Sequence, residues 1–335
     1  MMTTNAYFGV FIITVNLVVF GYFIIVNTTY LVLFTAAFFA AVKYVRRSKI
    51  VDLDEVFRSP LTPMVSVIIP AYNEAGVIVE VVHAALTLRY PRFEVVVVND
   101  GSVDATLDNL TGAYRLQRVT KVVEPTVPCE PIEGVYISGV HDNLVVLDKR
   151  HGGKADSLNA GINVSKGDII CTVDADSLLE QDALLKISRP FLEHPGETVA
   201  AGGVIRVING CEVSGSRVTR VRLPRGYWAN IQIVEYLRAF VGGRMGWAAL
   251  RALLIVPGAF GAFDRSTVVE VGGYDRHTSG RTWTWCSRCT CTSGRPGAST
   301  GSTSCPTLCA GRKSRCTGAR SRGSGTGGRG ARSNP

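Results

Sequence analysis

Charge is missing from two long stretches of this 335-residue chain. No Asp, Glu, Lys or Arg precedes Lys43, and no Asp or Glu follows Asp275. Eleven of the 36 Lys and Arg residues lie after Asp275, which leaves 25 of them against 27 Asp and Glu in the rest of the chain. The basic excess therefore belongs to segment 276–335 alone, and we expect no nucleic-acid binding by a folded domain.

The uncharged N-terminal stretch has the composition of a membrane anchor. Residues 8–42 are mostly apolar, with a polar patch at 27–29. As one helix they would run about 52 Å at ~1.5 Å per residue, well beyond a ~30 Å hydrocarbon core. The sequence therefore allows either one steeply tilted, protruding helix or a hairpin that breaks at the polar patch. A basic cluster from Lys43 to Lys49 follows, and the positive-inside bias places the next domain in the cytoplasm. We predict a cell-membrane anchor over 1–50 and a linker over 51–63.

Cysteine is sparse in the body of the chain and crowded in its tail. The scattered Cys129, Cys171 and Cys211 are typical of reduced, cytosol-facing cysteines. Zinc binding by the tail, starting from Cys286 and Cys289, is one interpretation. However, the tail has little apolar periodicity and too much Gly, Ser, Arg and Thr to pack a core, so we expect disorder over 276–335.

Between these two stretches, short apolar runs alternate with helical patterns. Helices are expected after Glu74 up to about Leu88, from Ala105 to about Leu116 and from Glu180 to Glu193. Residues 124–143 are expected to form a loop with one short strand. β-Branched and apolar composition predicts strands at Val65–Ile69, Phe93–Val98, Leu144–Leu147 and Asp168–Val173. Two strand-then-helix units in succession predict a doubly wound α/β sheet.

Two carboxylates follow the last of these strands. Open α/β sheets bind ligands at the carboxyl ends of their strands, so Asp174 and Asp176 are candidates to act together there. Their hard oxygen atoms suit Mg²⁺ or Mn²⁺ placed next to a diphosphate. The alternative is a solvated turn whose Asp and Ser side chains cap the next helix.

Aromatic residues and arginines are interleaved from Ile231 to Leu254. With Trp228, Trp247 and Phe240 among Arg238, Arg244 and Arg251, this pattern suits helices that lie at a membrane surface. An amphipathic helix packed on the sheet would have the same pattern, and the sequence leaves both interpretations open.

Five segments together resemble family 2 glycosyltransferases. The likeness runs in the family's order over Val65–Asp275 and is greatest to the membrane-embedded processive branch of cellulose, chitin, hyaluronan and poly-N-acetylglucosamine synthases. The fold that it implies is the glycosyltransferase A type, an α/β fold with a Rossmann-like mixed sheet sandwiched by helices, in a catalytic domain over 64–275. The segments are Pro70-Ala-Tyr-Asn-Glu74, Asn99-Asp-Gly-Ser102, Gly152-Gly-Lys-Ala-Asp-Ser-Leu-Asn159, Asp174-Ala-Asp176 and Gly258-Ala-Phe260.

The resemblance implies a uridine diphosphate (UDP) sugar as donor. It places Asp100 on the uracil or ribose, although an Asn-Asp-Gly turn would also explain this residue. The same resemblance places Pro70, Tyr72 and Glu74 in the nucleotide pocket.

The remaining segments are expected to hold the diphosphate, the metal and the acceptor. Lys154 would offer a cation to the phosphates, although a solvated surface lysine is the alternative. Asp174 would contact the donor and, with Asp176, bind the metal. The other expected contacts are Asp156 and Asn159 with the donor or ribose, and Gly258, Ala259 and Phe260 with the glycan acceptor.

The resemblance stops after Asp275. Family members carry a Glu-Asp motif there, whose aspartate is the general base for the acceptor hydroxyl, and later a Gln-x-x-Arg-Trp motif; this chain has neither. A shifted reading frame explains the loss. If each codon's third base joins the next two, Trp283 and Thr284 must give Asp, and the junctions from Ser279 permit Gly-Glu-Asp-Met-Asp-Leu-Val. Junctions from Gly323 to Ala331 likewise permit Gln-Arg-Asn-Arg-Trp.

The sequence as a whole therefore predicts a membrane-anchored, metal-dependent inverting glycosyltransferase. It would move a hexose or N-acetylhexosamine from a UDP-sugar to a growing polysaccharide, with its partners the donor, the glycan acceptor and the lipid bilayer. Because the base motif is missing, we expect this chain itself to be inactive. Two alternatives remain: a non-catalytic membrane protein that binds nucleotide sugars, and a membrane-anchored interaction protein that uses its basic tail.

Overall fold

The computed structural model describes residues 2–48, 62–120, 123, 125–177, 179–204, 211–214, 217–220, 222–250, 259–276 and 308–309. Most of the predicted linker and nearly all of the tail lie outside these residues, so the predicted tail disorder lies outside them too. Leu308–Cys309 is the described exception and forms a short strand. The domain boundaries stay predictions.

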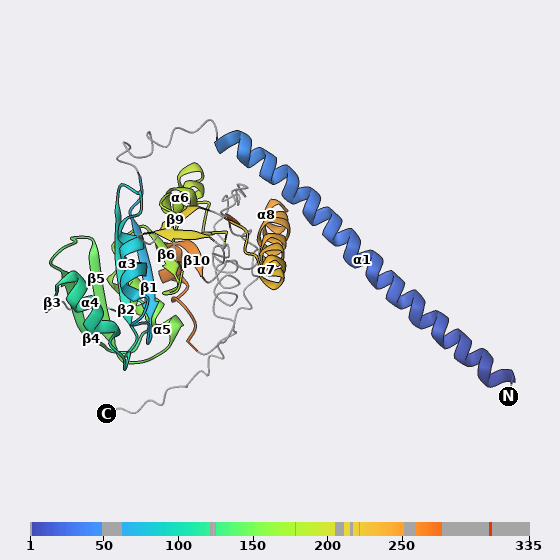
Figure 1. The fold of residues 1–335 in the computed structure, drawn as a ribbon, viewed down its shortest axis with the longest axis horizontal. Helices are drawn as coiled ribbons and strands as arrows, with labels where there is room; N and C mark the ends of the chain where they lie inside the picture. Colours follow the sequence, from blue (N-terminus) through green and yellow to red (C-terminus); the bar gives the residue numbers. More distant parts are fainter. Residues whose placement is uncertain are drawn as a thin grey trace, which may run out of the picture.

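The described residues form a nine-stranded mixed sheet in the order β11-β7-β10-β6-β1-β2-β5-β4-β3 (Figure 1). Its four central strands are parallel: β6 (Ile169–Val173), β1 (Val65–Ala71), β2 (Phe93–Asn99) and β5 (Leu144–Lys149). The flanking strands pair antiparallel: β4 (Ile132–Ser138), β3 (Leu116–Val119), β10 (Phe260–Asp264), β7 (Ala200–Gly202) and β11 (Leu308–Cys309). A separate hairpin joins β8 (Glu212–Ser214) to β9 (Arg217–Arg220).

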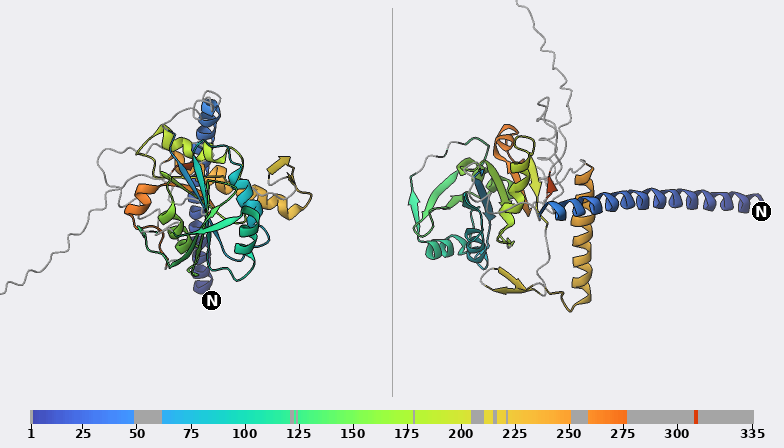
Figure 2. Two further views of the ribbon diagram at one scale, coloured as in Figure 1. Left: turned by 90° about the vertical axis from the view of Figure 1, so that its left-hand side faces the viewer. Right: turned by 90° about the horizontal axis from the view of Figure 1, so that it is seen from above.

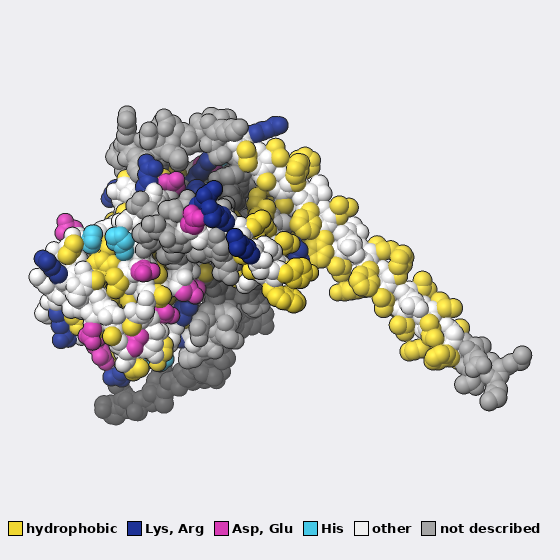
Figure 3. All heavy atoms as spheres, in the orientation of Figure 1, with side chains coloured by type: hydrophobic (Ala, Val, Ile, Leu, Met, Phe, Trp, Pro, Cys, Tyr) yellow, Lys and Arg dark blue, Asp and Glu magenta, His cyan; other side chains and the backbone are white. Residues whose placement is uncertain are grey.

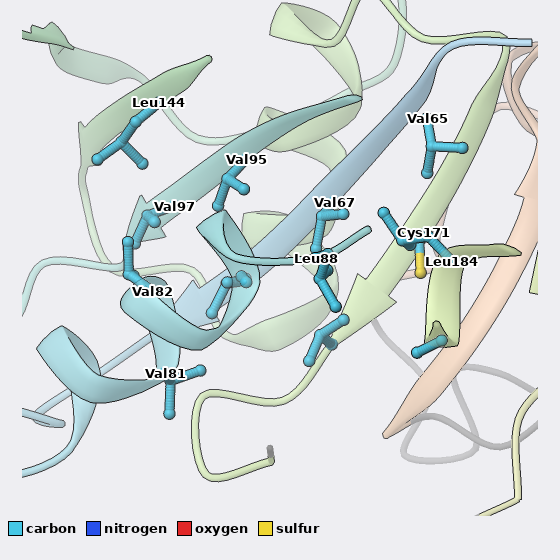
Figure 4. Packing of buried hydrophobic residues seen from close by; sticks show 14 of the residues in the cluster. Val65, Val67, Val81, Val82, Leu88, Val95, Val97, Leu144, Cys171 and Leu184 are labelled. Carbon is cyan, nitrogen blue, oxygen red and sulfur yellow. The ribbon is translucent and has the colours of Figure 1, made fainter. Parts of the chain in front are cut away.

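Alternating side chains of the central strands fill two cores, one on each face of the sheet. Val65, Val67 and Ile69 point into the first core, whereas Ile68 points into the second. Figure 4 shows the first core, where strand valines meet side chains of the covering helices. This burial on both faces explains why the parallel strands are continuously apolar, and it confirms the predicted α/β fold class.

Helices cover both faces of the sheet. The first core is covered by α3 (Ile78–Leu86), α4 (Thr106–Tyr114) and α6 (Ala183–Glu193), and the second by α5 (Lys154–Val164) and α9 (Arg265–Glu270). The helix α5 lies very close to the sheet, because a Cβ at Gly161 would stand 2.5 Å from Cγ2 of the buried Ile68. This close packing fixes the backbone of α5, whose first turn belongs to the candidate site.

The structure extends the predicted elements on one side of the sheet. The short strand expected within 124–143 is the seven-residue β4, and the helix expected to reach Leu116 ends at Tyr114. Arg115 has a left-handed backbone with φ of 48°, which ends α4 and lets Leu116 begin β3. The strand β4 was hard to predict because its exposed residues and the irregularity between Ile132 and Gly134 interrupt the apolar pattern.

The N-terminal stretch is one continuous helix, α1 (Met2–Ser48), and not a hairpin. The polar patch stays helical because Asn27 Nδ2 donates to the Phe23 carbonyl at 2.7 Å and Thr29 Oγ1 to the Ile25 carbonyl at 2.8 Å. The most apolar 18-residue window of the stretch Tyr7–Lys43 has a mean hydropathy of 2.5, and the stretch is long and apolar enough to cross a membrane. Figure 3 shows its hydrophobic side chains exposed as the helix leaves the body of the protein.

A second helical segment packs against the C-terminal half of α1 (Figure 2). It runs through α7 (Tyr227–Leu237), the π-helical η1 (Arg238–Arg244) and α8 (Met245–Ala249). A Cβ at Gly246 would stand 2.5 Å from the Leu33 carbonyl oxygen, so glycine allows the close approach. The structure packs this segment on α1, a contact that neither of the two interpretations of the sequence named.

Candidate active site

The loops after β1 and β2 interlock at the carboxyl edge of the sheet. The Asn73 amide donates to Ser102 Oγ at 3.0 Å, and the Val103 amide donates to Asn73 Oδ1 at 3.0 Å. Asn73 takes a left-handed backbone with φ of 57°, which asparagine tolerates better than most residues. These bonds hold the first two resemblance segments together.

The buried Asp100 carboxylate accepts hydrogen bonds from the loop that follows β5. The Gly152 amide donates to its Oδ1 at 3.0 Å, and the Gly153 amide donates to its Oδ2 at 2.7 Å. Glycine is needed at both positions, since Gly153 has φ of +86° and a Cβ on Gly152 would lie 2.7 Å from Asp156 Cγ. Asp100 therefore anchors the glycine loop in addition to its predicted place beside the nucleotide.

Lys149, at the end of β5, is fully buried between two aspartates. Its Nζ donates to Asp100 Oδ1 at 2.6 Å and lies 2.8 Å from Asp156 Oδ1. Burial alone would raise the pKa of the Asp156 carboxyl, but hydrogen bonds from Lys149, the Glu130 amide and Arg276 outweigh it and hold that pKa below its ordinary value. Asp156 therefore stays ionised and neutralises the buried ammonium group.

The side-chain amide of Asn159 forms hydrogen bonds with the segment before the tail. Its Nδ2 donates to the carbonyls of Pro128 and Tyr274 at 2.9 and 3.0 Å, and its Oδ1 accepts from the Tyr274 amide at 2.7 Å. Next to it, Arg276 Nη1 donates to Asp156 Oδ2 at 2.9 Å. Asp156 and Asn159 are both buried and bonded within the chain, and their predicted contact with the donor stays a prediction.

Lys154 and Asp174 form an ion pair across the carboxyl edge. Lys154 is the first residue of α5 and Asp174 directly follows β6; Nζ of the lysine contacts Oδ1 of the aspartate. Asp176 lies on the adjoining turn, exposed, with Ser177 Oγ donating to its Oδ1 at 3.3 Å. The structure thus brings the predicted phosphate-binding cation next to the predicted metal-binding carboxylates.

The donor set at this turn fits a hard divalent ion that shares its coordination with another ligand. Among the described residues, no three His, Cys, Asp or Glu side chains gather closely enough to hold a metal by themselves. Magnesium in particular is commonly bound by one or two carboxylates together with substrate phosphates and water. Asp174 and Asp176 could supply the protein's share of such a site.

The remaining predicted site residues line the same edge. Tyr72 is exposed and stacks on His151, with ring centroids 4.4 Å apart and planes tilted by 37°. Pro70 and Glu74 are half-buried on β1 and its loop. On the acceptor side, the Asp174 amide donates to the Ala259 carbonyl at 3.3 Å, and Phe260 begins β10. Gly258 lies outside the described residues.

Three side chains of this edge were not identified from the sequence as site residues: Lys149, His151 and Arg276. Lys149 offers one weak signal, a lysine at the end of an apolar strand just before two glycines. A nearby cavity of about 700 Å³ is lined by β3, β4 and the loop before β4, including Glu130, but not by Lys154, Asp174 or Asp176. The candidate site is therefore defined by the side chains at the strand ends and not by this cavity.

Comparison with known proteins shows the family to which the chain belongs. The model of the family "Glycosyl transferase family 2" matches residues 66–125 and 136–255, more than half of the chain. The chain belongs to glycosyl transferase family 2. It is 30% identical to the probable glycosyltransferase YdaM of Bacillus subtilis over 217 residues. These aligned residues cover 64% of this chain and 43% of that protein.

Two further proteins are similar to this chain at lower identity. The poly-β-1,6-N-acetyl-D-glucosamine synthase of Staphylococcus aureus is 24% identical over 212 residues, or 63% of this chain and 42% of that protein. The chain thus spans less than half the length of these curated relatives. A mannosyltransferase structure from Pyrobaculum calidifontis, in complex with GDP-Man and Mn²⁺, matches with 21% identity and a TM-score of 0.46, covering 78% of this chain and 62% of that one.

We predict that Lys149→Met destabilises the protein by about 3–5 kcal/mol, because it leaves Asp100 and Asp156 buried without their shared cation. Urea unfolding of the detergent-solubilised chain, followed by circular dichroism, would measure the change. Lys186→Met is the matched control: Lys186 pairs with Glu180 at 2.8 Å, but both side chains are largely exposed, so its loss should cost at most about 1 kcal/mol. Equal effects of the two substitutions would contradict this account of Lys149.

Proposed function

We propose that this protein is built as a membrane-anchored glycosyltransferase that takes a hexose or N-acetylhexosamine from a UDP-sugar to a growing glycan. Membership of family 2 supports the reaction class. The similarity to a poly-β-1,6-N-acetyl-D-glucosamine synthase supports an N-acetylhexosamine in particular. The single observation that carries the proposal is the meeting of Lys154 with the Asp174–Asp176 turn at the carboxyl edge of the sheet.

The nucleotide would lie over the ends of β1 and β2. The exposed ring of Tyr72, stacked on His151, offers an aromatic surface for a base, and the half-buried Pro70 and Glu74 flank it. Asp100 would face the uracil or ribose from beneath while it holds the glycine loop. Asp156 and Asn159 are positioning residues in this arrangement, since their bonds fix the start of α5 and the segment at Tyr274.

The diphosphate would lie between Lys154 and the aspartate turn. Asp174 and Asp176 would hold Mg²⁺ or Mn²⁺, which as a bound Lewis acid stabilises the charge of the leaving diphosphate. Lys154 adds a second positive charge on the opposite side, where two glycines let the backbone come close. The acceptor would approach past Ala259 and Phe260, which join the aspartate turn through the Asp174–Ala259 backbone bond.

Transfer by inversion requires that the acceptor hydroxyl lose a proton as its oxygen bonds to the sugar's anomeric carbon and the bond to the diphosphate breaks. Segment 276–335 contains no Asp or Glu side chain that could accept this proton. We propose that a frame change after Asp275 removed the family's base motif, so that this chain keeps a donor site without the base.

The helix α1 would be the membrane anchor. Its C-terminal half packs on the segment from α7 to α8, which carries Glu235, Arg238 and Arg244, so the span in the hydrocarbon would be the half before Tyr30. The basic cluster after Ala41 places the catalytic domain in the cytoplasm. Exposed aromatic side chains on α7, including Trp228, would face the bilayer surface.

Asp176→Asn should weaken Mn²⁺-dependent UDP binding by roughly tenfold or more, because it removes one of the two protein carboxylates from the metal. Isothermal titration of the detergent-solubilised chain with UDP, with and without Mn²⁺, measures this. Asp142→Asn is the matched control, an exposed aspartate in the turn before β5 at the opposite edge of the sheet. If the wild-type chain binds neither Mn²⁺ nor UDP, the proposed function is wrong.

The chain itself should show negligible sugar transfer, whereas a chain with the frame restored after Asp275 should regain it, because only the latter carries the base motif. Membranes with either protein are assayed with radiolabelled UDP-sugars one at a time. The nucleotide sequence gives an independent check: an early stop codon in the restored frame, or measurable transfer by the present chain, would refute the frame hypothesis.

Deleting residues 8–28 should release the protein from membranes, because it removes the proposed span but keeps the residues of α1 that meet α8. Flotation of cell membranes on a density gradient measures the bound fraction. Truncation after Arg276 is the control and should leave the protein membrane-bound, since it removes only the basic tail. Continued flotation of the deleted form would show that α1 is not the anchor.

A further inference from the structure

The ion pair between Lys154 and Asp174 joins two groups that need other partners when donor and metal are bound. The lysine side chain is 40% exposed and that of the aspartate 30%, so the pair is open to ligands from solvent. Both belong to the proposed donor site, one on the phosphate side and one on the metal side. A metal ion and a diphosphate would therefore each compete with the present ion pair for one of its two groups.

The position of Lys154 explains why it needs an anion at all times. It is the first residue of α5, where the unpaired amides and the helix dipole create partial positive charge, so a cation there is unfavourable without a counterion. The backbone of α5 cannot move away, because Gly161 packs against Ile68 and Asp156 is held by Lys149. Only the side chain of Lys154 is therefore able to exchange partners.

We propose that Lys154 is an exchangeable counterion of Asp174 that couples metal binding to nucleotide binding. Without ligands it neutralises Asp174. When both ligands arrive, the divalent ion takes over Asp174, and the Lys154 ammonium turns to the diphosphate. This inference rests on the proposed function and extends it to the way in which the two ligands bind.

The coupling follows from pairing of charges. A metal ion that binds alone displaces the ammonium group from Asp174 and leaves it unpaired at the helix start. A diphosphate that binds alone draws Lys154 away and leaves the Asp174 carboxylate facing phosphate charge. Of the states with a ligand bound, only the one that holds both gives every charge a partner, so each ligand increases the affinity for the other by the same factor.

Manganese binding is measured directly, from the electron paramagnetic resonance signal of free Mn²⁺, with the full chain in detergent and with or without saturating UDP. For the wild type we expect UDP to tighten Mn²⁺ binding by about 5–150-fold, the usual range of coupling between sites. Lys154→Met should bind Mn²⁺ alone several-fold more tightly than the wild type and UDP more weakly, with the coupling factor reduced at least threefold. Lys154→Arg, which keeps the charge, should resemble the wild type in Mn²⁺ binding.

Lys186→Met removes one positive charge from α6, the helix that follows the aspartate turn in the chain, and controls for the general change in charge. It should leave both affinities and the coupling unchanged. Equal coupling in Lys154→Met and the wild type overturns the exchange and leaves the proposed function standing, as does weaker binding of Mn²⁺ alone to Lys154→Met. The same gain of Mn²⁺ affinity in Lys186→Met also overturns it. A wild-type chain that binds neither ligand overturns both proposals. Circular dichroism of each variant confirms that it is folded.

Discussion

A single buried lysine holds the functional edge of this sheet together. Burying an ammonium group is costly unless the charge is paired and its hydrogen bonds are satisfied. Lys149 meets this condition with Asp100 from the end of β2, Asp156 from α5 and the Arg150 carbonyl at 2.6 Å. Because its partners come from three elements, the requirement for neutrality fixes the end of β2, the glycine loop and the start of α5 relative to one another.

This network separates the side chains that build the edge from those left to meet ligands. Asp156 and Asn159 have the residue types of ligand-binding groups, but their polar atoms are used inside the chain. Tyr72, Lys154 and Asp176 keep exposed surface at the same edge. A rigid buried layer under a few exposed side chains is the arrangement that precise positioning of a substrate requires.

The sequence was informative where a feature depends on local pattern. The β-branched runs of β1 and β2 predict central strands, since burial on both faces demands apolar residues without alternation. The partners of Lys149 could not be predicted in this way, because they depend on how the chain folds. Asp100, for example, lies 49 positions away from Lys149 in the sequence. The same holds for Lys154 and Asp174, which a pattern can nominate separately but only the sheet brings into contact. Motifs therefore indicated the edge, and the folded chain defined its pairings.

The anchoring of the last described body residues bears on the missing base. The Asn159 side chain forms hydrogen bonds with both the amide and the carbonyl of Tyr274. Arg276 forms ion pairs with Asp156 and Glu130. The chain is thus fixed beside α5 shortly before Ser279, where the restored frame would begin the Gly-Glu-Asp motif. Since α5 also carries Lys154, residues that follow Arg276 start close to the proposed diphosphate position. In the proposed function, the buried charges that shape the donor side would then also direct the base toward the acceptor.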